Sequence, residues 1–225
     1  MLIVLEGLDG AGKSTQLRMV TSYVASLGRK VEYLHFPRYN ASVYGELIAK
    51  FLRGDFGAID QVHPQLVALL FAEDRRDAAS LLCSWMDQGR VVVLDRYVYS
   101  NIAFQCAKLA NKEESDALRD WIFDLEYVHY GIPRPTLNLF LDVPLEFVDA
   151  KLRSSRKGGD RSYLAGKSDI HEADLSFQER VRTLYREQCA RDERFIRIEC
   201  GDEAGHMLPA ADIFRRIRNE IDAIL

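Results

Sequence analysis

The sequence predicts an α/β fold in which a five-stranded parallel sheet is flanked by helices on both faces. Short apolar runs without polar alternation, typical of strands buried on both faces, recur along the 225 residues. Segments with apolar residues at helical spacing separate these runs, and strands that alternate with helices favour parallel pairing through right-handed crossovers. A glycine-rich stretch follows the first run directly, at the carboxyl edge where such sheets bind ligands.

The elements follow one another in a regular order. Gly7 closes the first strand, Gly28 ends the first helix, Pro37 stops the second strand and Pro64 suits the first turn of a longer helix. The predicted strands cover residues 2–5, 30–36, 91–94, 136–143 and 195–199. The predicted helices cover residues 13–27, 42–52, 64–86, 99–110, 113–130, a segment opened by Pro144, 173–191 and 210–224. We expect a single domain over residues 1–225.

Composition and charge restrict the classes of function. Hydrophobic residues make up 48% of the chain, enough for a full core, so disorder is not expected. The formal charge of −4 argues against a nucleic-acid partner, because phosphate neutralisation dominates such binding. No apolar run is long enough to span a membrane, and the first residues lack a basic secretion signal. The default expectation is a cytoplasmic enzyme with no membrane partner.

The cysteines point to no metal or redox chemistry. They are Cys83, Cys106, Cys189 and Cys200, and no two of them form a C-x-x-C pair. Because free cysteine behaves as a small apolar residue, we expect four reduced thiols in or near the core.

Residues 7–15 read G-L-D-G-A-G-K-S-T and fit the P-loop pattern G-x-x-x-x-G-K-S/T. Glycines let backbone N–H groups approach phosphate oxygens, and the helix that follows directs its positive end at the same anion. Lys13 would reach the outer phosphates, and the Ser14 hydroxyl would ligate Mg²⁺. We therefore expect a P-loop NTPase fold whose ATP site comprises Gly7, Gly10, Ala11, Gly12, Lys13, Ser14 and Thr15.

A second signal lies at the end of the third predicted strand, where Asp95 precedes Arg96. The carboxylate suits the Mg²⁺ shell, and the guanidinium suits a second phosphate group. A structural ion pair is the alternative, because such pairs also occupy these sites. No N-K-x-D element for reading guanine follows a later strand, which argues against a GTPase. The combination favours phosphoryl transfer onto a phosphate acceptor.

With these motifs in place, the chain resembles bacterial thymidylate kinases over nearly its whole length. The resemblance rests on the P-loop stretch and on F-P-R-Y (36–39), L-L-F-A-E-D-R (69–75), L-D-R-Y-V-Y-S-N-I-A-F-Q (94–105), G-I-P-R-P-T-L-N-L-F-L-D-V (131–143) and F-Q-E-R-V-R-x-x-Y (177–185). The D-R-Y and F-A-x-D-R elements are specific to the family, whereas the P-loop is not. The resemblance implies that ATP phosphorylates dTMP to dTDP.

The resemblance also implies roles for residues of the acceptor site. Phe71 would stack on thymine, and Arg75 would bind the edge of the base. Arg96 and Arg38 would bind the acceptor phosphate or position the residue that binds it. The full dTMP set is Asp9, Phe36, Arg38, Tyr39, Phe71, Arg75, Arg96, Asn101, Phe104 and Gln105. Alternatives stay open at this point. Phe71 and Phe104 also suit plain core, Arg75 and Arg76 one solvated face, and Asn101 and Gln105 a helix bridge.

Residues 151–171 are predicted to form a mobile lid. The stretch K-L-R-S-S-R-K-G-G-D-R (151–161) carries five cations and one acid. The resemblance implies that Arg153 and Arg156 stabilise charge on the transferred phosphoryl group, because Gly10 stands where one branch of the family has an arginine. Glu172 joins Asp9, Ser14 and Asp95 as a candidate for the Mg²⁺ site, and His171 is expected at the surface. A solvated basic loop is the alternative.

The expected catalytic set is therefore Lys13, Arg96, Arg153, Arg156 and Asp9, acting on ATP and dTMP with Mg²⁺. The family also implies a homodimer. One alternative is another P-loop kinase, either for a different nucleoside monophosphate or for a deoxynucleoside, whose hydroxyl would need Glu6 or Asp9 as a base. A nucleotide-dependent switch without turnover is the other.

Overall fold

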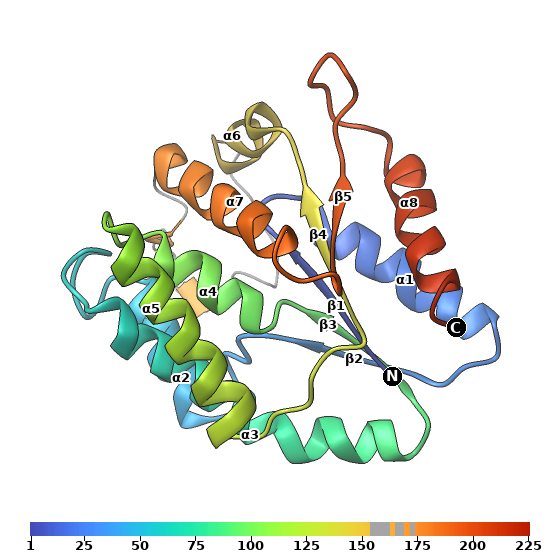
Figure 1. Cartoon of the computed structure of the whole chain (residues 1–225), viewed down its shortest axis with the longest axis horizontal. Coiled ribbons are helices and arrows are strands. Elements are labelled where there is room, and N and C mark those ends of the chain that lie inside the picture. Colours follow the sequence, from blue (N-terminus) through green and yellow to red (C-terminus); the bar gives the residue numbers. More distant parts are fainter. Residues whose placement is uncertain (154–162, 165–168, 172–173) are drawn as a thin grey trace.

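The computed structural model describes residues 1–153, 163–164, 169–171 and 174–225. Within these residues one parallel sheet has the strand order β2-β3-β1-β4-β5 (Figure 1). Its strands are Leu2–Gly7 (β1), Val31–His35 (β2), Val91–Asp95 (β3), Leu137–Asp142 (β4) and Phe195–Glu199 (β5). The predicted five-stranded parallel sheet is confirmed.

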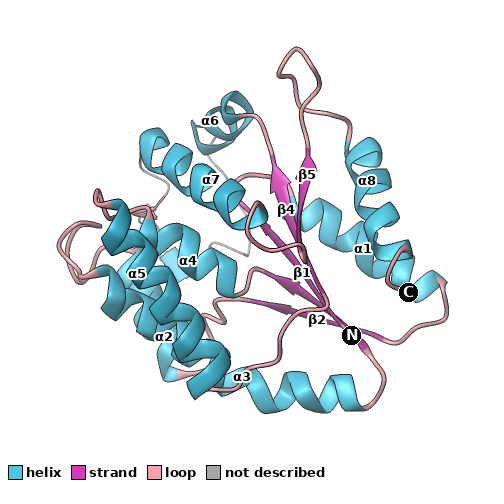
Figure 2. Ribbon diagram, viewed as in Figure 1, coloured by secondary structure: helices cyan, strands magenta, loops and turns pink. Residues whose placement is uncertain are grey.

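Helices cover both faces of this sheet (Figure 2). They are Lys13–Ser26 (α1), Val43–Leu52 (α2), Pro64–Asp87 (α3), Val98–Cys106 (α4), Lys112–Phe123 (α5), Leu145–Arg153 (α6), Leu175–Cys189 (α7) and Ala210–Asp222 (α8). Helices α1 and α8 pack together on one face, whereas α3, α4 and α7 pack on the other. Helix α5 lies outside α4, so this side of the molecule has an additional helical layer.

The burial of the strands follows from this layering. Every residue of β1, β3 and β4 is buried, because these central strands have helices on both faces and a neighbour at each edge. The edge strands β2 and β5 are only partly buried. Cys106 and Cys200 are buried as expected, but the prediction is wrong for Cys83, which lies exposed on α3.

The largest departure from the predicted elements follows α5. The helix expected over residues 113–130 is interrupted at Asp124–His129 by a segment with the wider turns of a π-helix (η1). Glu126 lies in this segment and is fully buried, four residues after the buried Ile122 of α5, so it continues the buried face of that helix. Irregular turns of this kind often occur at functional sites.

The connection before α5 is longer than predicted. Helix α4 ends at Cys106 rather than near residue 110, and Asn111 caps α5 by accepting hydrogen bonds from the N–H groups of Glu113 and Glu114.

The predicted lid, residues 151–171, is described only in part. Helix α6 extends to Arg153, and beyond it only residues 163–164 and 169–171 are described.

Asp142 joins the last two strands to α7. Its carboxylate, at the end of β4, is fully buried and accepts hydrogen bonds from Arg182 (2.6 Å) and Arg186 (2.8 Å) of α7 and from Arg197 (2.5 Å) of β5. These guanidiniums keep part of their surface in water, whereas the carboxylate does not. Its desolvation is therefore offset by three charge-assisted bonds.

Replacing Asp142 with alanine is expected to lower the free energy of unfolding by about 3 kcal/mol, because three clustered cations lose the carboxylate that holds them together. Equilibrium urea unfolding checks this value. The matched control is Asp212→Ala, which removes the partly exposed helical partner of the exposed Arg215 and is expected to cost less than about 1 kcal/mol. Equal losses in the two variants would show that Asp142 does not join these elements.

Candidate active site

Two connected cavities lie at the carboxyl edge of the sheet. The larger holds about 940 Å³ and is lined by residues 9–15 of the P-loop, the end of β2 and Asp95. The smaller, which we call the inner pocket, lies between α2, α3 and α4. Asp9, Arg96 and Tyr39 line both. The sequence-predicted phosphate site and acceptor site are therefore neighbours that share charged residues.

The P-loop has the backbone that its glycines predict. Gly10 and Gly12 have φ values of 78° and 81°, in the left-handed region that favours glycine. Gly12 precedes the first residue of α1, so the free N–H groups of that helix face the larger cavity. Ser14 and Thr15 line the same space. The loop thus forms a site for an anion at the start of a helix.

Lys13 is nearly buried beneath this loop. Its ammonium donates to the carbonyl oxygen of Leu8 at 3.2 Å. Burial lowers its pKa, and the positive charge of Arg96 acts in the same direction, against Asp95 and Asp9. An anion in the larger cavity would therefore stabilise the charged ammonium.

Arg96 lies where the two cavities meet. Its backbone has φ 68°, which is uncommon for a residue other than glycine. Its guanidinium donates to Asp9 at 2.8 Å, to Ser100 at 3.1 Å and to Tyr185 at 3.4 Å. Burial alone would lower its pKa, but Asp9 and the neighbouring groups outweigh that effect and raise it. Arg96 remains a cation beside both cavities.

Glu6 anchors this arrangement from β1, and sequence reasoning offered it only as an alternative catalytic base. Its carboxylate is fully buried and accepts from the backbone N–H groups of Tyr97 (2.9 Å) and Ser100 (3.2 Å). The hydroxyls of Ser100 and Tyr185 also donate to it. Burial raises the pKa of Glu6 more than these bonds lower it. The group fixes the start of α4 against β1.

Asp95 and Arg96 do not form the structural ion pair that was the alternative interpretation. Asp95 contacts His35 instead, with 3.2 Å between the Asp95 Oδ2 and His35 Nδ1 atoms. Its other carboxylate oxygen has no partner among the described residues and is buried. The charge of Lys13 and the hydrogen bond from His35 outweigh the effect of burial and lower the pKa of Asp95 to about 2.

The far end of the inner pocket is built on a buried ion pair. Arg75 is 2% exposed, and its guanidinium binds both carboxylate oxygens of Glu126, at 2.5 and 2.7 Å. Asn101 donates to the same carboxylate and to the carbonyl of Ala68, both at 3.0 Å. The solvated-face alternative is therefore wrong for Arg75, although Arg76 beside it is exposed. The helix-bridge alternative does not describe the contacts of Asn101, because its partners lie on other elements.

The walls of the inner pocket are aromatic. They comprise Phe36, Tyr39, Phe71, Tyr97, Phe104 and Tyr163. Phe71 is half-buried, and Phe104 is buried with the Arg96 guanidinium 5.0 Å from its ring centroid. Phe104 is therefore buried with the core and also lines the inner pocket. Gln105 is also buried in the lining, and its side-chain oxygen accepts from Lys108 at 2.7 Å.

Arg38 lines the larger cavity rather than the inner pocket. Its guanidinium donates hydrogen bonds to the carboxylates of Asp74 at 2.9 Å and Asp77 at 2.6 Å. Its backbone N–H also donates to Asp74, at 2.9 Å. Two carboxylates thus hold the guanidinium, which suits a supporting role beside Arg96.

His171 is buried, so the surface position expected for it is wrong. Its ring packs against Phe51, Phe104 and Phe177, and burial holds its pKa well below the usual range. Its Nε2 atom has no partner among the described residues. His171 is therefore a neutral imidazole in the pocket lining.

Tyr163 and Asp169 complete this wall, and sequence reasoning missed both. Tyr163 stacks on Tyr39 with 3.8 Å between ring centroids and donates to Asp169 at 2.7 Å. The space left in the inner pocket is about 60 Å³, far below what a nucleotide needs. Entry of a ligand of that size would require this wall to move.

The remaining predicted lid residues cannot be placed. Arg156 and Glu172 lie outside the described residues, as does the side chain of Arg153. The described residues contain no cluster of three or more His, Cys, Asp or Glu side chains suited to a metal. Ser14 and the unpartnered oxygen of Asp95 nevertheless fit Mg²⁺ that is held mainly by phosphates, because such ions take only one or two protein ligands.

Comparisons with known proteins identify the family and the fold of the chain. Residues 5–206 match the family model for thymidylate kinase. The chain is 35% identical over 191 residues to thymidylate kinase of Mycobacterium tuberculosis, which covers 84% of this chain and 86% of that one. It is 36% identical over 154 residues to the Homo sapiens enzyme, covering 68% of this chain and 65% of that one. A solved thymidylate kinase structure from Candida albicans superposes with TM-score 0.73 at 23% identity, covering 99% of this chain and 91% of that one, which supports the fold.

Lys108 is expected to make the stability of the protein depend on pH. Its ammonium lies 4.6 Å from the ring centroid of Phe51, and burial lowers its pKa from 10.5 to about 7. Between those pH values the unfolded chain binds more protons than the folded one, so stability rises with pH. Replacing Lys108 with methionine should abolish that rise and add on the order of 2 kcal/mol to the free energy of unfolding at pH 7. Urea unfolding of both proteins from pH 6 to 10 measures the free energy of unfolding at each pH. Parallel pH profiles for the two proteins would contradict this prediction.

Proposed function

The chain belongs to the thymidylate kinase family, and we propose that its two connected cavities bind ATP and dTMP during transfer of the γ-phosphoryl group, which yields dTDP and ADP. One observation carries the assignment of the cavities. The larger is lined by residues 9–15 of the P-loop, the inner pocket has an aromatic wall, and Arg96 and Asp9 border both. A donor phosphate and an acceptor phosphate bound in this way would meet beside Arg96.

The reaction needs positioning more than proton transfer. The phosphate of dTMP is already largely ionised at neutral pH, because its second pKa is about 6. No general base is then required for attack. Lys13 and Arg96 supply fixed positive charge where negative charge develops, and they need no reorganisation during the reaction. The buried network that holds Arg96 supports this role.

The inner pocket suits thymine. Phe71 offers a face for base stacking, and the Arg75 guanidinium is held in the lining by Glu126. Asn101 has a side-chain oxygen without a partner among the described residues, next to this guanidinium. Together they offer both donors and an acceptor for a base edge. Phe104 and Tyr39 would crowd a 2′-hydroxyl, which favours a deoxyribose.

Mg²⁺ fits the phosphate site through the Ser14 hydroxyl and Asp95, with Asp9 and Glu172 as further candidates. Bound there with ATP, the ion would neutralise phosphate charge. Asp95 keeps its carboxylate ionised, since its pKa is about 2. Lys13, on the same loop, would add the second positive charge on the donor side.

Further aspects of the function stay predictions. The lid cations Arg153 and Arg156 would supply the charge that Gly10 cannot. The homodimer is a prediction that rests on the family resemblance alone. Among the described helices, none is both long and apolar enough to cross a membrane. The cytoplasmic location rests on the sequence.

The deoxynucleoside-kinase alternative fits the site less well. A hydroxyl acceptor needs a carboxylate base within reach. Glu6 is fully buried and occupied by four donors, and Asp9 is paired with Arg96. Neither carboxylate is available as a base, whereas a phosphate acceptor needs none.

A coupled ADP-release assay over nucleoside monophosphates and nucleosides tests the assignment. We expect dTMP to give the highest kcat/KM, and thymidine to give no turnover. The control is Lys13→Ala, expected to stay folded while kcat falls by at least about 100-fold, the loss typical of one preorganised charge stabiliser. Equal rates with thymidine, or a fully active Lys13→Ala protein, would overturn the proposal.

A further inference from the structure

A separate cavity of about 490 Å³ lies at the opposite edge of the sheet from the P-loop. We call it the basal cavity, because Asn138 and Arg194 place it where β4 and β5 begin. Its lining comprises Tyr99, Arg119, Phe123, Tyr127, Arg134, Pro135, Asn138, Gln188, Arg191, Asp192 and Arg194. None of these residues belongs to the two cavities described above. Its volume lies in the range of small-molecule sites.

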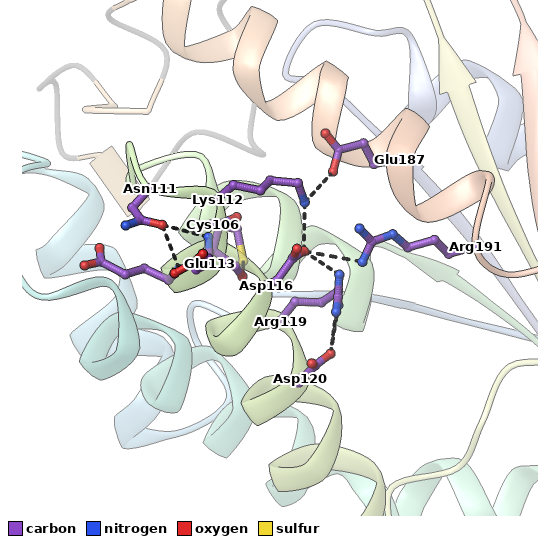
Figure 3. Close-up of polar contacts among 11 residues, drawn as sticks. Cys106, Asn111, Lys112, Glu113, Asp116, Arg119, Asp120, Glu187 and Arg191 are labelled. Carbon is purple, nitrogen blue, oxygen red and sulfur yellow. Dashed lines mark hydrogen bonds and ion pairs between the residues drawn. The ribbon is translucent and has the colours of Figure 1, made fainter.

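Four arginines border the basal cavity, with one carboxylate among them. Arg119 and Arg191 both bind Asp116 of α5, at 2.5 and 3.3 Å, and Arg119 also binds Asp120 at 2.7 Å (Figure 3). Arg134 and Arg194 are exposed and pair with no carboxylate in the described part of the chain. The lining acid, Asp192, already accepts from the Tyr99 hydroxyl at 2.5 Å and from the Arg194 backbone N–H at 2.8 Å. Arg119 and Arg191 are therefore already neutralised, whereas Arg134 and Arg194 keep a positive charge at the rim that favours an anion.

The floor of the basal cavity is polar and buried. Asn138 is 3% exposed, and its side-chain oxygen has no partner among the described residues. Gln188 contributes a second amide that is also 3% exposed. Burying an unpaired amide at the start of β4 is unfavourable, whereas leucine or valine would pack there at no such cost. The amide edge is thus suited to hydrogen bonding with something in the cavity.

Aromatic rings form the side of the cavity between rim and floor. The Arg134 guanidinium lies 4.1 Å from the ring centroid of Tyr127, which in turn stacks on Phe123. Such a surface suits a planar heterocycle. The cationic rim suits the phosphates of a nucleotide. The aromatic wall suits the face of its base, and the buried amide floor suits the edge of the base.

We propose that the basal cavity binds a nucleoside polyphosphate. Arg119, Arg134, Arg191 and Arg194 would contact its phosphates, and the amides of Asn138 and Gln188 would read the base. Guanidinium groups suit phosphate because their donors form a planar fork. This binding is distinct from the proposed reaction, since the cavity lies at the other edge of the sheet.

Calorimetric titration tests the site once the active site is filled. Adenosine and thymidine joined by five phosphates would first occupy both catalytic cavities, and ATP or dTTP is then added. We expect one further equivalent per chain. Replacing Arg134 and Arg194 with glutamine should weaken it at least tenfold, whereas the control pair Arg29→Gln and Arg215→Gln, exposed arginines outside the cavity lining, should not.

The role of the floor is tested by Asn138→Leu. We expect the Tm of this variant to be unchanged or higher, because an unpaired buried amide is removed. We expect its affinity for ATP or dTTP to fall to the affinity for inorganic tripolyphosphate. No heat after active-site saturation, equal binding of tripolyphosphate and nucleotide by the unmodified protein, or unweakened binding by the double arginine variant would each overturn the proposal. Failure of the bisubstrate to bind would instead count against the proposed function.

Discussion

A cation fixed at the carboxyl edge of β3 is the constraint around which the active site is built. Arg96 takes an unusual backbone conformation, and its guanidinium is largely withdrawn from water. Such a group is stable only where carboxylates and hydroxyls compensate for lost hydration. Asp9 supplies the charge, Ser100 and Tyr185 supply oxygens, and Glu6 holds those hydroxyls in turn. The P-loop, β1, α4 and α7 are thereby tied to one point between the larger cavity and the inner pocket.

Two other buried charge systems extend this organisation. The pair of Arg75 and Glu126 joins α3 to η1 and fixes the end of the inner pocket, while Asp142 joins β4 and β5 to α7. Replacing such pairs with apolar residues would often stabilise a protein, so stability alone does not explain their presence. The Arg75 guanidinium and the Asn101 amide both lie in the pocket lining. Their placement leaves polar groups facing the inner pocket, at the expense of maximal packing energy.

The sequence allowed the sheet, its flanking helices and the P-loop to be predicted, because these depend on local patterns. Buried central strands read as continuous apolar runs, and Gly10 and Gly12 mark the turn that needs positive φ. What could not be predicted depends on contacts between distant segments. Glu126 meets its partners Arg75 and Asn101 from two other helices, and His171 is buried because Phe51, Phe104 and Phe177 enclose it. Tyr163 pairs with Tyr39 across more than a hundred residues, and no local pattern signals such a contact.

The most direct test of this account is the kinetics of Arg96→Lys beside the exposed control Arg76→Lys. Lysine keeps the charge but loses the planar fork that bonds Asp9, Ser100 and Tyr185 together. We predict that kcat/KM for dTMP falls by about 100-fold or more, the scale of one preorganised electrostatic contact, while Tm stays within a few degrees of wild type. The control should stay near wild-type activity. An Arg96→Lys protein with kcat/KM within about threefold of wild type, under 1 kcal/mol of barrier, would contradict the account.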